Sequence, residues 1–214
     1  MERVTDLADA YKVMGDNLIG FKEISSSKLL STFLSLSNAE NCNFVPYNID
    51  ELIKVKDSHL LILVIPSFRD GSNLKFNHFR NFFGLNPDYS EPCFYNQDWY
   101  LNEVFYCNST LDFSWCLISK EISIETRGQI PSKNQFGSSL LSALQYTYIF
   151  FIHFVLNGFP IWQYDYIWTS DYDDSNDQIY VGRYTDINHN NKNGFSIHRH
   201  LSIKKNYGTI NAIR

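Results

Sequence analysis

The sequence predicts an α+β fold, in which one long buried helix is followed by several short antiparallel strands. Residues 140–157 carry apolar side chains at helical spacing, and the pattern ends at Gly158. After this helix, four short strand-like segments alternate with turns that are rich in Asp and Asn. No fixed-period repeat and no linker rich in Pro or Gly divides the 214 residues, so we expect one compact globule.

The first 57 residues are expected to form a mainly helical N-terminal segment, and residues 58–214 an α+β ligand-binding domain. Apolar residues recur at helical spacing between Val4 and Leu36, with a break at the serines 25–27. Asn48 and Glu51 stand three residues apart and predict the capping box of a further short helix.

Two strands are predicted in the first half of the larger domain. Residues 59–65, HLLILVI, form a continuous aliphatic run, which is typical of a strand buried on both faces. Residues 113–118 form the second strand. Residues 68–84 between them are ambiguous, because their phenylalanines could line one face of a helix that ends at Gly84.

The strongest helix of the chain is predicted to begin at a capping serine, Ser132 or Ser138, and to end at Gly158. Its apolar run, residues 147–162, is shorter than the roughly 20 residues that a membrane span requires and contains His153. We interpret it as a buried core helix and His153 as a hydrogen-bonded interior residue. The strands expected after it are Tyr166–Ser170, Gln178–Arg183, Phe195–Leu201 and Thr209–Ile213.

Charge and cysteine content exclude several classes of partner. The formal net charge is -5 and no basic stripe is present, so a nucleic acid is not expected as the partner. The four cysteines form no C-x-x-C pair and no zinc pattern with histidine, and the N-terminus lacks the form of a signal peptide. We therefore expect reduced thiols, no cofactor, no membrane partner and a cytoplasmic location by default, with surface display by another route left open.

An acidic turn invites a calcium interpretation. Four aspartates lie within seven residues: Asp171, Asp173, Asp174 and Asp177. An EF-hand loop that begins at Asp171 would need Gly at its sixth position and Glu at its twelfth, where Asn176 and Gly182 stand. A solvated turn with local side-chain to backbone hydrogen bonds is the better interpretation.

Histidines near the C-terminus are the next candidates for chemistry. In a strand, His198 and His200 would lie on the same face, with Arg199 opposite, and could bind zinc or act as general acid and base. No zinc spacing supports this, so we interpret them as surface or ligand-contacting residues and predict no metal.

Catalysis by other side chains has little support. The sequence lacks G-x-S-x-G, a Walker loop and G-x-G-x-x-G. Asp98 and Glu103 flank an aromatic pair and could act as paired carboxylates, but such residues more often accept hydrogen bonds from backbone N–H groups. No catalytic residue is predicted, and a non-enzymatic role is favoured.

The C-terminal region combines polar and aromatic side chains in a way that predicts a binding surface. Residues 163–211 contain 6 Tyr, 6 Asp, 7 Asn and 4 Ser, almost half of the window. Tyrosine offers contact area at low entropic cost, and asparagine offers both donors and acceptors.

The same half of the chain resembles the C-type-lectin-like fold in its bacterial form. The resemblance rests on Ile130-Pro131-Ser132 before a helix, the strand Trp168-Thr169-Ser170, and the segments 178–182, 195–197 and 210–214. It implies a small sheet near the ligand face, formed by the W-T-S strand, an aromatic strand and the closing strand. The E-P-N and W-N-D motifs of calcium-dependent sugar binders are absent from this sequence.

One branch of that fold comprises the variable proteins of diversity-generating retroelements in bacteria and phages. Mutagenesis directed to adenines enriches Asn, Asp, Tyr and Ser on the ligand face of these proteins, and the composition of residues 163–211 is similar. A genome rich in A and T is the alternative source of this bias.

These observations lead to a functional hypothesis, a non-enzymatic, receptor-like module that binds a protein or other macromolecule. A metal-assisted hydrolase or nuclease, using the turn at 171–177 with His198 and His200, is the first alternative. A structural subunit of a larger assembly is the second. The predicted binding residues are Tyr164, Tyr166, Tyr172, Tyr180, Tyr184, Asn188, Asn190, His198, His200 and Tyr207.

Overall fold

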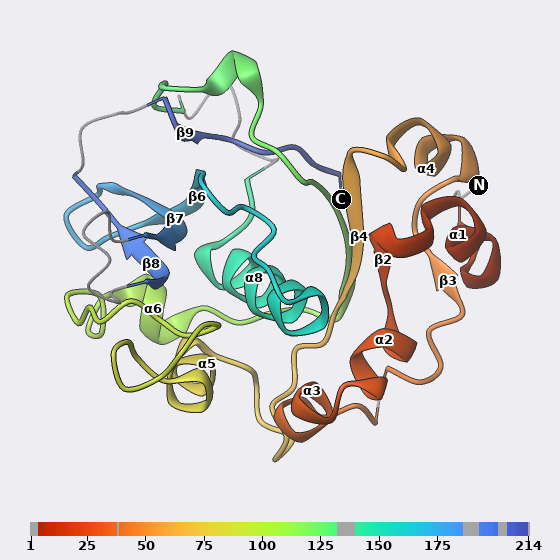
Figure 1. Ribbon diagram of the computed structural model, residues 1–214, viewed down its shortest axis with the longest axis horizontal. Helices are drawn as coiled ribbons and strands as arrows, with labels where there is room; N and C mark the ends of the chain where they lie inside the picture. The colour runs from red at the N-terminus through yellow and green to blue at the C-terminus, as the bar shows by residue number, and fades with distance from the viewer. Residues whose placement is uncertain (1–3, 38, 132–139, 186–192, 201–204, 214) are drawn as a thin grey trace.

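Helix α8 (Ala143–Asn157) lies between two four-stranded sheets in the computed structural model (Figure 1). The structure describes residues 4–37, 39–131, 140–185, 193–200 and 205–213. The helix contacts strands of both sheets, so its two sides are covered by β-structure. The predicted α+β class is confirmed.

The N-terminal segment is mainly helical but also contributes strands. It contains β1 (Thr5–Asp6), α1 (Leu7–Met14), the 3-10 turn η1 (Gly15–Asn17), β2 (Leu18–Ile19), α2 (Phe21–Ser26), α3 (Lys28–Phe33), β3 (Phe44–Val45) and α4 (Ile49–Val55). The predicted capping box is confirmed: Asn48 Oδ1 accepts from Glu51 N at 2.8 Å, and Glu51 Oε2 accepts from Asn48 N at 3.2 Å. Strand β2 pairs in parallel with the aliphatic strand β4, which joins this segment to the rest of the chain.

The first sheet has the order β10-β5-β4-β2 and is built around β4 (His59–Val64). Strands β5 (Ser114–Ser119) and β10 (Ala212–Ile213) continue it in antiparallel pairing. All residues of β4 after His59 are buried, so the predicted strand with two buried faces is confirmed. The Tyr148 hydroxyl of α8 donates to Leu63 O at 2.9 Å and accepts from Ile65 N at 3.1 Å, which fixes the helix against this sheet.

Between the two main strands of this sheet, the ambiguous region forms helix α5 (Phe76–Phe83), which ends at Gly84 with a φ of 72°. Phe83 of α5 packs on Phe151 of α8, with the ring centroids 4.5 Å apart. The phenylalanine spacing thus marks a helix that packs against the core. Among the described residues, the remaining short helices are α6 (Val104–Asn108) and the 3-10 turn η2 (Ile124–Thr126).

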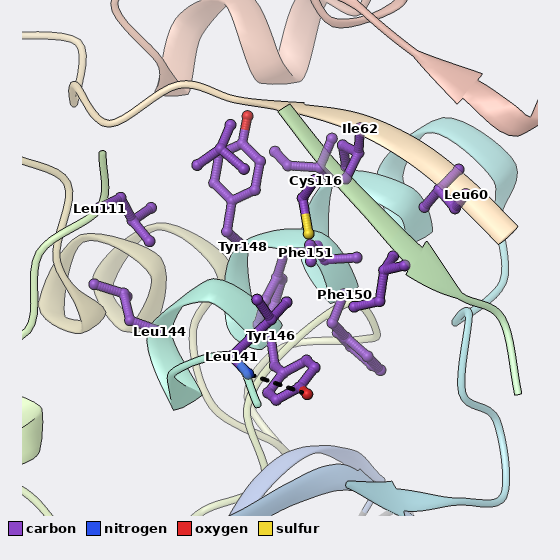
Figure 2. Close-up of a cluster of buried hydrophobic side chains, with 14 of the residues drawn as sticks. Leu60, Ile62, Leu111, Cys116, Leu141, Leu144, Tyr146, Tyr148, Phe150 and Phe151 are labelled. Carbon is purple, nitrogen blue, oxygen red and sulfur yellow. Dashed lines mark hydrogen bonds between the residues drawn. The ribbon is translucent and has the colours of Figure 1, made fainter. Parts of the chain in front are cut away.

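Helix α8 is buried almost all round. Every residue from Ala143 to His153 is buried except Gln145. Figure 2 shows Tyr148 and Phe151 beside Ile62 and Cys116 of the first sheet. The buried core helix is therefore confirmed, and His153 is an interior residue whose Nδ1 lies 3.1 Å from Phe159 O. Across the described ranges, no helix combines the length and apolarity needed to cross a membrane.

The start of α8 differs from the predicted one. Ser142 is the N-cap: its Oγ accepts from Gln145 N at 3.2 Å, and Gln145 Oε1 accepts from Ser142 N at 2.9 Å. A capping box needs Gln or Glu three residues after the cap, which Ser142 has. Ser132 and Ser138 fall outside the described residues; Ser138 has Leu141 at that position, whereas Ser132 is followed by Gln135.

The second sheet, called the C-terminal sheet below, has the order β8-β7-β6-β9. Its strands are β6 (Tyr166–Tyr172), β7 (Gln178–Tyr184), β8 (Gly194–His198) and β9 (Tyr207–Gly208). The first two begin where the sequence predicts and run slightly longer, whereas β8 ends at His198 instead of reaching residue 201. The three consecutive strands β6, β7 and β8 are antiparallel, and β9 joins β6 in parallel.

The predicted strand Thr209–Ile213 is confirmed only for its last two residues, which form β10, while β9 ends at Gly208 in the other sheet. Thr209 N donates to Thr126 Oγ1 and Thr209 O accepts from Ser123 N, so its backbone is bonded to the η2 region instead of a ladder. Strand β10 then pairs with β5. The closing strand therefore belongs to the first sheet, not to the small sheet that the resemblance implied.

Replacement of the cap of α8 is expected to destabilise the whole chain. We expect Ser142→Ala to lower the free energy of unfolding by about 1 kcal/mol, because the backbone N–H of Gln145 loses its acceptor, Ser142 Oγ. Urea unfolding followed by far-UV circular dichroism measures this change. The matched control is Ser31→Ala inside α3, where the hydroxyl only donates to Lys28 O and no loss is expected. Equal losses in both variants would contradict the capping role.

Candidate ligand-binding site

The C-terminal sheet has two chemically different faces. Its inner face is apolar and packs into the main core with α8 through Ile167, Val181 and Ile197. Because side chains alternate along a strand, the residues between these lie on the opposite side, which we call the outer face. The outer face consists of Tyr166 and Trp168 from β6, Tyr180 and Gly182 from β7, Ser196 and His198 from β8, and Tyr207 from β9.

The strand register places the aromatic side chains of the outer face in one cluster. Trp168, Tyr180 and His198 lie directly opposite one another on three neighbouring strands. Tyr180 meets Trp168 edge-on at 4.9 Å between centroids and stacks on His198 at 5.6 Å. Tyr207 stacks on Tyr166 at 5.0 Å. These contacts form a second aromatic cluster, separate from the main core.

Gly182 is required for this arrangement. A Cβ at this position would lie 2.7 Å from Cδ1 of Tyr166 and 2.7 Å from Asp165 O. The absence of a side chain lets the Tyr166 ring lie across β7 and reach the cluster.

Two ring nitrogens in the outer face are buried without a hydrogen-bond partner: Trp168 Nε1 and His198 Nε2. Such orphaned groups are rare in folded proteins, because an unpaired buried N–H costs free energy. Trp168 as a whole is 6% exposed. Other tryptophans differ in this respect, since Trp162 Nε1 donates to Ser119 O and Trp99 Nε1 donates to Ile197 O.

The outer face is uncharged at neutral pH. Burial lowers the pKa of His198 to about 4, so its imidazole is neutral. Burial raises the pKa of Tyr166 to about 12 and also raises the pKa of Tyr207, so both phenols keep their protons. Ser196 Oγ donates to Gly182 O at 3.1 Å, and its proton is therefore engaged by the backbone.

The structure brings together half of the predicted binding residues. Tyr166, Tyr180, His198 and Tyr207 meet in the cluster, and Tyr184 continues the same face of β7 and stacks on Tyr95 at 4.6 Å. Tyr166, Tyr180 and Tyr207 are buried, so they are not displayed on an open surface as the composition suggested. The cause is their position on adjacent strands, which packs the rings against one another.

The other predicted residues lie elsewhere. Tyr164 precedes β6 and is 71% exposed, and Tyr172 follows an irregularity in the pairing of β6 with β7. His200 is exposed and lies beyond the end of β8. Asn188 and Asn190 fall outside the described residues. Whether any of the ten contacts a ligand stays a prediction.

Sequence reasoning missed several residues of the outer face. Trp168 has the same strand parity as Tyr166, so the period of two would have indicated it. The same alternation places Gly182 on the face of Tyr180 and Ser196 on the face of His198, so both residues could have been assigned to the outer face. Gln97 contacts His198 from a distant loop, and no sequence signal predicts that contact.

The acidic turn between β6 and β7 is held by local hydrogen bonds. Asp173 Oδ1 accepts from Ser175 N at 2.9 Å and from Asp177 N at 2.7 Å, while its Oδ2 pairs with Arg199 at 2.5 Å. Burial alone would raise the pKa of Asp173, but the bond from Asp177, the Arg199 guanidinium and the bond from Ser175 outweigh it and lower the pKa. The local bonds expected for this turn are present, although Asp173 itself is buried.

His198 and His200 do not share a face, so that expectation is wrong. The chain leaves the strand after His198, and His200 has a φ of 60°. Its Nε2 lies 3.3 Å from Asp177 Oδ2, and ligand atoms of Asp173, Asp177 and His200 lie within 4.8 Å of one another. Arg199 already forms an ion pair with Asp173, so a metal ion would compete with the guanidinium for this carboxylate.

Two further acidic residues have structural contacts. Asp171 is separate from the turn and accepts from Ala143 N at 2.7 Å, at the start of α8, where burial raises the pKa of its carboxyl group. Glu103 Oε2 accepts from Asp174 N at 2.8 Å, as expected for a carboxylate that binds a backbone donor.

Two hollows occur elsewhere among the described residues. One, of about 510 Å³, lies beside β5 and is lined by Pro46, Tyr47, Trp115 and their neighbours. The other, of about 460 Å³, lies at the end of β5 around Lys120 and Asn211. None of the predicted binding residues lines either hollow.

Comparison with known proteins adds no family assignment: no protein-family model, no curated protein and no solved structure matches the chain.

His198, which is half-buried and has a buried Nε2, predicts a specific acid sensitivity. Its pKa in the folded state, about 4, is below the ordinary 6.5, so the unfolded chain binds the proton more readily. The stabilisation from neutral His198 is present above pH 6.5 and is lost as the pH falls toward 4. This loss is at most about 3 kcal/mol.

Urea unfolding of the wild type and of His198→Asn at pH 7.5 and pH 4.5 measures this effect. We expect the loss of unfolding free energy between these pH values to be smaller in the variant. The other buried histidines contribute equally to both proteins and cancel in the difference. The same pH dependence in both proteins would show that His198 is not held neutral by the fold.

Proposed function

We propose that the chain is a non-enzymatic ligand-binding module, with its site on the outer face of the C-terminal sheet. The observation that carries this proposal is the pair of buried, unpaired ring nitrogens of Trp168 and His198 within an aromatic cluster. A cluster that served only as core would be expected to pair these groups or to replace them with apolar rings. A bound ligand would supply the missing partners.

Two tyrosines beside this face, one exposed and one half-buried, supply a second layer of contacts. We define the rim as Tyr164 and Tyr184. Tyr184 extends the outer face along β7, and the backbone of Tyr164 accepts from Asn206, which precedes Tyr207 of the cluster. Rigid aromatic side chains around a buried centre are typical of surfaces that bind proteins. We therefore propose a protein as the partner.

We also propose a C-type-lectin-like arrangement for the C-terminal half. In support, α8 is followed by the antiparallel strands β6, β7 and β8. If the chain is a variable protein of a diversity-generating retroelement, we expect the diversified positions to include the rim. The packed residues Tyr166, Tyr180 and Tyr207 would then remain constant.

A metal-assisted hydrolase is the second candidate, and one observation favours it. Donor atoms of Asp173, Asp177 and His200 lie within 4.8 Å of one another. His198 would not take part, because it belongs to the aromatic cluster. Arg199 and two backbone N–H groups already use both oxygens of Asp173, so we rank this function below ligand binding.

Loss of the rim is expected to abolish binding without unfolding the protein. Peptides selected from a random library on the immobilised wild type should lose at least tenfold in affinity for the Tyr164→Ala/Tyr184→Ala double variant, as expected when aromatic anchors are truncated. Surface plasmon resonance measures the affinities. The control is Phe44→Ala on β3, an aromatic residue that is 57% exposed on the side opposite the C-terminal sheet (Figure 1). Peptides that bind all three proteins equally would place the site elsewhere.

Metal analysis separates the two candidate functions. We expect substoichiometric zinc in the protein purified without chelators, because the ion pair of Arg199 with Asp173 already balances the buried carboxylate. Inductively coupled plasma mass spectrometry gives the content. One zinc per chain in the wild type, lost in His200→Ala, would favour the hydrolase over the binding module.

A further inference from the structure

The two unpaired nitrogens of the outer face are both hydrogen-bond donors. An indole Nε1 always carries a proton, so Trp168 can only donate. For His198, the proton position follows from Gln97. The Gln97 Oε1 accepts from Ile197 N at 3.3 Å, which orients the amide so that its NH₂ group faces His198 Nδ1 at 3.4 Å. Because Nδ1 accepts this bond, the proton of the neutral imidazole lies on Nε2.

These donors belong to one row of the sheet. Trp168, Tyr180 and His198 are directly opposite one another on β6, β7 and β8, so the donors lie on either side of the Tyr180 ring. Two unpaired donors define what is missing: a group with hydrogen-bond acceptors. Each unpaired buried donor costs about 1–3 kcal/mol, and an acceptor would recover this free energy.

The charge of the site decides what kind of acceptor fits. The residues of the outer face carry no charge at neutral pH. Nearby ionic groups are already paired on other elements, Arg199 with Asp173 and Arg183 with Glu91. A carboxylate would be desolvated beside ring faces, which carry partial negative charge, and none of the outer-face residues defined above is a cation at neutral pH. An ammonium group only donates hydrogen bonds, so it could not pair with the two N–H donors and its charge would be repelled by them. An uncharged acceptor avoids both costs.

We propose that the outer face receives an uncharged, planar acceptor group, an amide or another carbonyl, that accepts from Trp168 Nε1 and His198 Nε2. This inference rests on the proposed function and specifies the chemistry of its ligand. Amides and other carbonyls are planar and accept hydrogen bonds without carrying a charge. For a protein partner, the group would be a backbone carbonyl or the side chain of Asn or Gln.

A matched series of three small probes tests the inference: benzamide, benzoate and benzylammonium share one ring and differ in the charge of the head group. The measurement is the indole Nε1–H signal of Trp168 in ¹H–¹⁵N correlation spectra of the intact chain, assigned with Trp168→Phe. We expect benzamide to shift this signal in a saturable manner. We expect the two ions to bind at least tenfold more weakly, as the desolvation of a charge requires.

The outcomes separate this inference from the proposed function. If benzoate or benzylammonium shifts the Trp168 signal and benzamide does not, the face binds ligands but the assigned chemistry is wrong. If none of the probes shifts the signal at concentrations that saturate weak fragments, the inference is overturned. The rim experiment with selected peptides judges the proposed function independently of either result.

Two tryptophan variants supply the control for the donor itself. Trp168→Phe keeps an aromatic ring and removes the unpaired N–H, so benzamide affinity should fall about fivefold, the share of one hydrogen bond. Trp162→Phe removes a donor that Ser119 O already accepts and should leave the affinity unchanged. Signals of His198 and Tyr180 report binding in both variants. If Trp168→Phe fails to fold, His198→Phe takes its place, and unchanged affinity in the folded variant overturns the inference.

Discussion

The structure depends on the burial of one helix on all sides. Helix α8 carries no Asp, Glu, Lys or Arg between Ala143 and His153, and its side chains there are buried except Gln145, so every side of it must be covered. The first sheet covers one side, where the Tyr148 hydroxyl bonds to Leu63 and Ile65 of the chain around β4. The C-terminal sheet covers another through Ile167, Val181 and Ile197. Neither sheet could lose its apolar face without exposing the helix.

That constraint also explains the outer face. The inner residues of β6, β7 and β8 must be apolar because they cover α8. The residues between them point to the opposite face, so contact with α8 does not restrict their chemistry. They are aromatic and polar in this chain, and the register aligns them in rows across the strands. Asp171 links the two parts, because the carboxyl group near the end of β6 accepts from Ala143 at the start of α8. The position of the outer face is thus fixed to the helix that forms the core.

The sequence predicted those elements whose signal is local. The aliphatic run of β4, the capping box at Asn48 and the glycine that ends α8 depend on neighbouring residues, and all three are confirmed. The division of residues 207–213 between two sheets was not predictable, because it depends on the contact of Thr209 with Thr126. The separation of His198 from His200 depends likewise on a backbone turn that strand parity alone does not reveal.

The distinction between displayed and buried tyrosines sharpens the argument for binding. Composition alone treats Tyr164 and Tyr180 as equivalent, yet one is 71% exposed and the other 1%. An exposed ring can be exchanged at little cost to stability, whereas the ring of Tyr180 contacts Trp168, His198 and Tyr207 at once. A site built from both kinds can change partners through its rim while the cluster and its two donors keep one geometry. The donors would then set the common chemistry of all partners, and the rim would set the choice among them.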